Sequence, residues 1–421
     1  MRSSIQQMIY GETGKDNASG YQVLMAYLFF IPFCMPIVNP MFFNKVIYLY
    51  ALIPLIDLVF IRNTIRHTGL LDWAVLSLIL IAGLLSMDAI AMAKLIVLIM
   101  AIAYMSYLWQ RGLFYIFYWI ILLTVIVSII QYAAAIVGPE WAKLVGPRKI
   151  YSLIWGMELR GNTNFYATNF TGGFLMRVSG MSLEAGFYSA LISTSIMMYL
   201  LDHRVVRTRL VMGLLILGYL LSLSKIGFSL LLVMLIFPFR RIVNRIPAPI
   251  ALISAIGLMF LVIGAVYDVL PEIAHLPTFA HRTLGYVLLW DLSTEAFFLG
   301  ADPQALVDLV RTLISGFVAD FLEGQRNLFT GIPLIIAENG IIFAFALLMA
   351  LIVKGSDAVR AVFYLLVTFS VNPMTSDSFV IAATFLLIST GFSEQHAPSA
   401  KAHVVQSVQR PPKGAIAQVP I

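Results

Sequence analysis

The chain has 421 residues, of which 60% are hydrophobic and only 11% are charged, and it carries a net charge of +6. Its mean hydropathy is +0.91. Soluble domains contain about 25% charged residues, so this chain has too few ionisable side chains to cover a water-facing surface of its size. The composition excludes a cytoplasmic enzyme, a nucleic-acid-binding protein and a disordered scaffold, and it predicts an integral membrane protein.

Apolar segments recur along most of the chain. A bilayer core of about 30 Å needs about 20 mostly apolar residues per helix. We therefore expect an all-α, polytopic membrane helix bundle with about twelve transmembrane helices. The predicted spans cover residues 21–42, 46–61, 70–87, 89–109, 113–137, 184–201, 209–224, 226–239, 249–270, 332–353, 359–372 and 376–392.

The basic residues predict the orientation of these spans. Lys and Arg favour cytoplasmic loops, and with a cytoplasmic N-terminus the short outside connections hold only Lys45 and Lys225. The inside segments include two clusters of three arginines, namely Arg204, Arg207 and Arg209, then Arg240, Arg241 and Arg245. Both termini are therefore expected in the cytoplasm, and the net positive charge is explained by orientation rather than by a nucleic-acid partner.

Two long loops, 138–183 and 271–331, face outward in this topology. Residues 1–392 are expected to form one transmembrane domain that includes both loops. Residues 393–421 have no apolar period, which predicts a disordered cytoplasmic tail. The sequence has no internal repeat, and this argues against a secondary transporter built from repeats.

The first outward loop combines aromatic and amide side chains, among them Trp155, Tyr166 and Asn169. Aromatic rings stack on sugar faces and amides bond sugar hydroxyls, so these three residues are candidates for a carbohydrate groove. The same composition fits an aromatic belt at the membrane interface equally well.

Arginines also gather on the outward side, including Arg177, Arg282 and Arg326. The guanidinium group stays charged, and its planar fork matches phosphate oxygens. This cluster suits a lipid-linked diphosphate in the outer leaflet, with Lys225 as a further cation. The alternatives are solvated or glutamate-paired loop arginines, and a lysine that only extends to the interface.

The usual motifs for metal and nucleotide binding are missing from the sequence. It contains neither Asp-x-Asp nor His-Glu-x-x-His, and the glycine-rich segment 11–15 is too short for a phosphate loop. We therefore expect chemistry without a bound metal, cytoplasmic ATP or another cofactor.

Several short motifs follow one another between residues 175 and 345. They read Arg177-Val-Ser-Gly180-Met-Ser-Leu-Glu184 before a span, Ser222-Leu-Ser224-Lys225-Ile-Gly227, Arg282 opening a predicted helix toward Trp290, Gln325-Arg326-Asn327, and Ala337-Glu338-Asn339-Gly340 leading into the next span. In their order and topological positions these motifs resemble the superfamily of O-antigen ligases and Wzy-type polysaccharide polymerases.

This resemblance implies a metal-independent glycosyltransferase of the multi-span, lipid-donor type in the bacterial inner membrane. Its substrate would be an undecaprenyl-diphosphate-linked oligosaccharide, used at the periplasmic face, and a chain-length regulator protein would be a partner. A polymerase moves the growing glycan onto another lipid-linked unit, whereas a ligase moves it onto lipid A core. Ligases carry His-Asn near the end of the large loop. This chain has Arg326-Asn327 there, which favours a polymerase.

The resemblance also suggests roles for individual residues. Arg177, Arg282 and Arg326 would stabilise negative charge on the departing lipid diphosphate, with Arg282 counted among the catalytic residues. Glu184 is the first candidate for the base that accepts the sugar hydroxyl proton, and His281 is the second. The alternatives are a helix-start carboxylate favoured by the helix dipole for Glu184 and a surface-loop histidine for His281.

Two rival functions are weighed against this one. A transporter or lipid flippase would need ionisable residues inside the membrane. Only Asp57 and Lys94 have such positions, and the sequence suggests no intramembrane partner for either. A polymerase of the shape–elongation–division type would share the lipid donor, but the outward loops lack the acidic signature expected of it.

Overall fold

The computed structural model describes residues 19–42, 45–67, 77, 81, 89–156, 169–171, 175–182, 184–202, 204–205, 208–222, 224, 236–270, 277–302, 305–306, 308–309, 331–352, 357–369 and 377–389. These residues are mostly helical and include two short antiparallel hairpins, so the predicted helical fold class is confirmed. The predicted tail, 393–421, lies outside the described residues.

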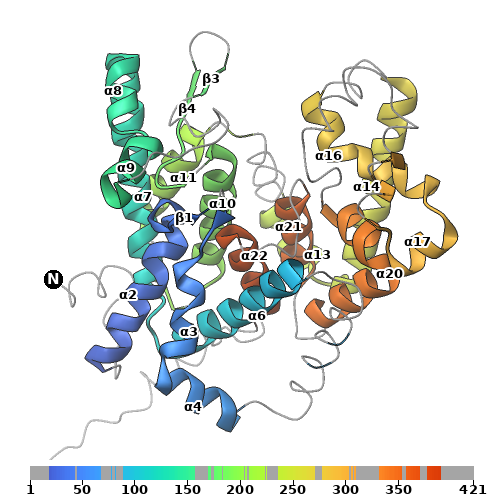
Figure 1. The fold of residues 1–421 in the computed structure, drawn as a ribbon, viewed down its shortest axis with the longest axis horizontal. Coiled ribbons are helices and arrows are strands. Elements are labelled where there is room, and N and C mark those ends of the chain that lie inside the picture. The colour runs from blue at the N-terminus through green and yellow to red at the C-terminus, as the bar shows by residue number, and fades with distance from the viewer. Residues whose placement is uncertain are drawn as a thin grey trace, which may run out of the picture.

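Helices of the first half pack into one group, seen in Figure 1 from blue to green. They are α2 (Gly20–Cys34), α3 (Ile53–Ile56), α4 (Leu58–His67), α6 (Ala89–Gln110), α7 (Tyr115–Val137), α8 (Pro139–Leu144), α9 (Pro147–Trp155), α10 (Ala185–Leu201) and α11 (Arg209–Ser222). The hairpins are formed by β1 (Met41–Phe42) with β2 (Lys45–Val46), and by β3 (Asn169–Thr171) with β4 (Leu175–Arg177).

The later helices lie mainly in a second group, drawn in yellow and orange in Figure 1. They are α13 (Arg240–Val243), α14 (Ala248–Val269), α16 (Pro277–Leu288), α17 (Thr294–Leu299) and α20 (Gly331–Ile352). The last two helices, α21 (Ala358–Thr368) and α22 (Ser378–Ile388), are drawn in red between the two groups. Helix α21 packs against both α14 and α22, and α22 packs against α6 and α10. The last two helices therefore join the two groups.

Apolar helices indicate a membrane protein. Within the described ranges, three helices are long and apolar enough to cross a membrane, namely Met92–Gln110, Tyr115–Val137 and Ala248–Val269. Six shorter apolar helices match further predicted spans in part, while the predicted spans 70–87 and 226–239 lie mostly outside the described ranges. The predicted span 46–61 is wrong as one continuous helix, because the chain is extended at Asp57 between α3 and α4. The count of twelve spans stays a prediction.

Aromatic side chains fill the core between α2, α6 and α7. Phe29 and Phe33 of α2 stack with their ring centroids 5.4 Å apart, and Phe30 meets Phe117 of α7 at 5.6 Å. All three phenylalanines of α2 are fully buried. Packing of this kind, together with the apolar surfaces of the helices, holds the first group together.

Polar contacts at one end of the bundle, here called the basic end, connect loops that the sequence assigns to the same side. The Arg204 guanidinium stacks on the Trp109 ring at 3.6 Å from its centroid and donates a hydrogen bond to the Trp109 carbonyl. The Phe114 and Phe385 rings lie 5.5 Å apart. The Arg204 contacts place the end of α6 next to the connection between α10 and α11, and the ring contact places α22 next to the start of α7.

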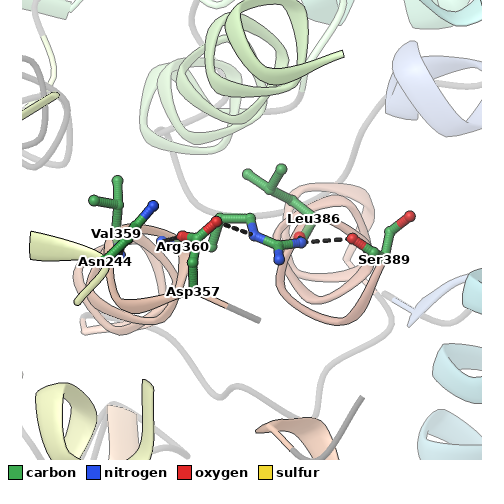
Figure 2. Close-up of polar contacts among 6 residues, drawn as sticks. All are labelled: Asn244, Asp357, Val359, Arg360, Leu386 and Ser389. Carbon is green, nitrogen blue, oxygen red and sulfur yellow. Dashed lines mark hydrogen bonds and ion pairs between the residues drawn. The ribbon is translucent and has the colours of Figure 1, made fainter. Parts of the chain in front are cut away.

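The basic end also contains a buried arginine (Figure 2). Arg360 is fully buried, and its Nε donates to Asp357 Oδ2 at 3.0 Å. Its Nη1 donates to the carbonyls of Leu386 at 3.0 Å and Ser389 at 2.5 Å, which are among the last of α22. Asn244, after α13, accepts from the Val359 N–H at 3.2 Å. Arg360 therefore connects the start of α21 to the end of α22.

Helix α20 is broken near its middle. Gly340 has φ +80° and ψ 159°, and a Cβ there would lie 2.1 Å from the carbonyl oxygen of Phe298. The Ala301 N–H also donates to Ala337 O at 2.7 Å, so α17 and α20 approach backbone to backbone. The Glu338–Gly340 motif therefore lies at the break and leads into the second half of α20, and the close approach of α17 requires a glycine there. Whether that half crosses a membrane stays a prediction.

Gly340→Ala should destabilise the protein by at least about 1–3 kcal/mol, because the new Cβ meets both a glycine-only backbone conformation and the α17 backbone. Gly257→Ala is the matched control, since open space surrounds Gly257 in α14 and alanine favours helix. The melting temperatures of the two variants in detergent test this prediction. Equal melting temperatures would contradict it.

Candidate functional site

The segment that carries Arg177 and Glu184 is held between several helices at the end of the bundle opposite the basic end. Val178, directly after β4, donates its N–H to Leu221 O of α11 at 3.2 Å, and the Ile37 N–H donates to Met181 O at 3.2 Å. Gln131 of α7 donates to Gly180 O at 2.8 Å. These contacts fix the backbone between the two predicted site residues.

Gly180 explains why the motif needs a glycine at this position. Its φ is +55°, and a Cβ would lie 2.8 Å from the Tyr188 ring and 3.1 Å from Thr124 O. The Tyr188 hydroxyl in turn donates to Ser128 Oγ at 2.9 Å. The glycine lets the chain turn tightly over α7, so that Arg177 and Glu184 lie on either side of the turn.

Glu184 occupies the N-cap position of α10, but its side chain makes no capping hydrogen bond. Loss of water contact raises the pKa of the Glu184 carboxyl above its ordinary value, and the charges of Arg177 and Arg282 oppose that rise. The side chain still reaches solvent, so its dehydration is partial. The carboxylate therefore does not cap its own helix, and the charges of two arginines act on it.

Arg282, in α16, is the second arginine whose charge acts on this carboxylate. Burial lowers the pKa of the Arg282 guanidinium, Glu184 opposes that change, and Arg177 adds to it. Helix α16 packs on α14, and its Tyr286 ring stacks on Phe369 with centroids 5.7 Å apart. The expectation that Arg282 opens a helix is wrong, because α16 already begins at Pro277, whose ring suits a first helical turn.

The structure thus brings together three predicted residues from three segments: Arg177 from β4, Glu184 before α10 and Arg282 from α16. The Arg177 Nε is buried and has no hydrogen-bond acceptor among the described residues. A buried N–H without a protein acceptor is costly. A bound anion is a partner that would satisfy it and match the positive charge.

Asp377 is a site residue that the sequence reasoning missed. It is the N-cap of α22, its side chain accepts a hydrogen bond from the Tyr48 hydroxyl at 2.6 Å, and its charge acts on Glu184. An Asp before an apolar helix is a recognisable N-cap signal. That signal predicts a helix start and says nothing about which other carboxylate lies beside it.

The sugar-binding candidates are described only in part. Trp155, at the end of α9, packs against the small cluster formed by Ile37 and Tyr151, and its buried Nε1 has no acceptor among the described residues. Asn169 pairs with Arg177 across the β3–β4 hairpin, but its side chain is outside the described residues, as is all of Tyr166. Both the carbohydrate groove and the aromatic belt stay open for Trp155.

Three further candidates cannot be located at the site. Arg326 and Lys225 lie outside the described residues. His281 precedes Arg282 in α16, but its side chain is outside the described residues as well. In the described part of the chain, no group of three or more His, Cys, Asp or Glu side chains is arranged to hold a metal ion.

The carboxylate that the transporter hypothesis depends on has a structural partner. Asp57 is fully buried, and its Oδ2 accepts from the Tyr104 hydroxyl at 2.7 Å. Its Oδ1 accepts from the backbone N–H groups of Val59 and Phe60 at 3.0 and 3.1 Å, so it caps α4. The expectation that Asp57 has no intramembrane partner is wrong, because Tyr104 of α6 lies beside it.

Comparisons with protein-family models, with curated proteins and with solved structures found no match for this chain.

Proposed function

We propose that this protein is a Wzy-type polysaccharide polymerase. It transfers a growing glycan from undecaprenyl diphosphate to the sugar of another lipid-linked repeat unit. The observation that carries this proposal is that Arg177 and Arg282, from two separate segments, lie close enough for their charges to act on the Glu184 carboxylate. Two cations and a partly dehydrated carboxylate supply what such a transfer needs, namely charge stabilisation for a diphosphate leaving group and a base for a hydroxyl.

The proposed topology has twelve spans in the bacterial inner membrane, with both termini in the cytoplasm and the site at the periplasmic face. This topology is supported by the residues that lie at each end of the helix bundle. Arg204 and Arg360 lie at the basic end, while Glu184 and Asp377 begin helices at the opposite end. Lys and Arg favour the cytoplasmic side, so the site end would face outward.

In the proposed reaction, a hydroxyl oxygen of the acceptor sugar forms a bond to the anomeric carbon of the donor glycan. The bond from that carbon to the phosphate oxygen breaks, and undecaprenyl diphosphate leaves with the electron pair. The hydroxyl proton passes to the Glu184 carboxylate. Arg177 and Arg282 stabilise the charge that develops on the diphosphate more in the transition state than in the ground state, and only such binding accelerates the step.

Purified protein supplied with a lipid-linked oligosaccharide, without nucleotide or added metal, tests the proposal. A ladder of longer lipid-linked glycans would support the polymerase. Transfer only to lipid A core, supplied in a parallel reaction, would instead identify a ligase, the alternative against which Arg326-Asn327 argues. If neither product forms, the transporter hypothesis gains and the proposed function fails.

Replacing Arg177 or Arg282 with alanine should slow glycan elongation by about 10²–10³-fold, the usual cost of removing one well-placed donor. Lysine should restore only part of the rate, because it keeps the charge and loses the planar fork. Arg148→Lys is the matched control, since Arg148 is an exposed arginine of the first outward loop. A normal length distribution of products in the site variants would contradict the diphosphate role.

A further inference from the structure

Two helices that begin at the site run side by side. Helices α10 and α22 pack against each other, and the rings of Phe187 and Phe379, close to their respective N-termini, lie 5.2 Å apart. Each helix has an acidic N-cap residue, Glu184 or Asp377, and neither side chain makes a capping hydrogen bond. Two carboxylates therefore lie at neighbouring helix starts, and neither of them caps its own helix.

The Asp377 carboxylate is held in place by a residue from a distant part of the chain. The Tyr48 hydroxyl donates to Asp377 Oδ1 at 2.6 Å, a short hydrogen bond of the kind formed with an ionised acceptor. Tyr48 is itself positioned by the Tyr50 ring, 5.3 Å away, and Tyr50 is buried against α2. The hydrogen bond fixes where the negative charge of Asp377 lies relative to α10.

Among the residues that the structure describes, three charged groups act on Glu184: the cations Arg177 and Arg282, which lower the pKa of its carboxyl, and the anion Asp377, which raises it. Two guanidinium groups beside a carboxylate make it a weaker base. A second carboxylate nearby opposes that effect. The proposed base Glu184 thus lies near two positive groups and one negative group, whose effects on its pKa oppose each other.

We propose that Asp377 is a positioning residue for Glu184, and that its carboxylate, oriented by Tyr48 at the neighbouring helix start, balances the two arginines that share Glu184. The proposal rests on the proposed function, in which Glu184 accepts the proton of the attacking hydroxyl. Asp377 touches neither substrate nor the reacting atoms in this scheme. It acts through its charge on Glu184.

The pH profile of glycan elongation distinguishes this role from a purely structural one. Glu184 must be ionised to act as a base, so elongation fails as the pH falls through its pKa. Asp377→Asn removes a negative charge, which should move this acid limb to lower pH and reduce the rate on the plateau. Asparagine is a strong N-cap, so the start of α22 should be preserved.

Two further variants separate charge from packing. Asp377→Glu keeps the charge and should restore the acid limb to its original position. Tyr48→Phe removes the hydrogen bond but keeps the charge, so the acid limb should stay close to its original position while the rate falls modestly. If Asp377→Asn lowers the rate at every pH by the same factor and leaves the acid limb at its wild-type pH, the proposal is overturned.

A measurement without substrate keeps this inference distinguishable from the proposed function. Infrared titration of the protein in detergent, taken as the difference between wild type and Glu184→Gln, follows the Glu184 carboxyl directly. Its midpoint should fall in Asp377→Asn and return in Asp377→Glu, and an unchanged midpoint would overturn the link between the two carboxylates. A wild-type protein that titrates as expected but elongates no glycan would overturn the proposed function instead.

Discussion

Glu184→Gln should slow glycan elongation by about 10²–10⁴-fold, the range typical for loss of a general base, while the protein remains folded. The reason is chemical, because the amide keeps the shape of the carboxyl group and cannot accept the hydroxyl proton. The measurement is the initial rate of product formation from a purified lipid-linked oligosaccharide, with wild type and variant at equal concentration in the same detergent.

The pH dependence follows from the direction of the Glu184 pKa. Partial dehydration raises this pKa above its ordinary value, and the two arginines only oppose that rise. Wild-type elongation should therefore lose activity on the acid side at a higher pH than an ordinary glutamate base would give. The residual activity of Glu184→Gln should lack this acid limb, because the group that titrates is gone.

Thermal stability gives an independent readout of the same residue. A carboxyl whose pKa is higher in the folded state than in the unfolded state disfavours folding at pH values above its folded pKa, and this effect disappears below its unfolded pKa. Glu184→Gln removes the ionisation altogether. At neutral pH the variant should therefore unfold at the same temperature as wild type or a higher one.

Glu140→Gln is the matched control for these measurements. Glu140 is a glutamate of the first outward loop, 83% exposed, and it pairs with Lys143 on the surface of α8 at 2.9 Å. Exposed pairs of this kind contribute little to stability, so both its rate and its melting temperature should match wild type. A Glu184→Gln variant that elongates glycan as fast as this control would show that another group accepts the proton.

How much of this site could be predicted from sequence depends on whether each residue belongs to a local motif. Arg177, Gly180 and Glu184 are close in the sequence, and their spacing around a tight turn before a span predicts that the two charges lie near each other. Arg282 was predicted from its place in the order of motifs. Asp377 was missed because its bond to Tyr48 joins residues 329 positions apart, and no periodicity encodes such a contact.

The basic residues illustrate a different limit of sequence reasoning. Counting Arg and Lys predicted which connections share a side, and several of those connections do meet at the basic end of the bundle. The same count treats arginines as solvated charges. Arg111, Arg204 and Arg240 instead stack on aromatic rings at 5.5, 3.6 and 4.4 Å from the ring centroids. Their individual partners depend on tertiary packing, which composition does not contain.

Arg360 is the strongest case, because it lies at the start of the predicted span 359–372 and is fully buried. Arg360→Ala should reduce the free energy of unfolding by about 3–5 kcal/mol, the usual cost of removing one partner of a buried ion pair. The substitution leaves Asp357, only 15% exposed, without the guanidinium that faces it. It also removes the donor shared by the Leu386 and Ser389 carbonyls at the end of α22.

A double-mutant cycle separates these two contributions. Asp357→Asn keeps a good N-cap for α21 and removes only the charge, so its cost measures the ion pair. If the ion pair dominates, the double variant Arg360→Ala with Asp357→Asn should cost clearly less than the sum of the single variants. If the α22 carbonyls dominate, the two costs should add. SDS-induced unfolding in mixed micelles provides the free energies.

Asn244→Ala is the control for this region, since it removes one neutral hydrogen bond to the Val359 N–H and should cost only about 0.5–1.5 kcal/mol. An Arg360→Ala variant no less stable than Asn244→Ala would contradict a structural role for the buried arginine. Arg360→Ala also offers a test along α22, because this helix has Asp377 as its N-cap and ends at the Arg360 contacts. If α22 is released at its basic end without unfolding, Asp377 should lose its fixed position beside Glu184, and the acid limb of elongation should move in the direction expected for Asp377→Asn.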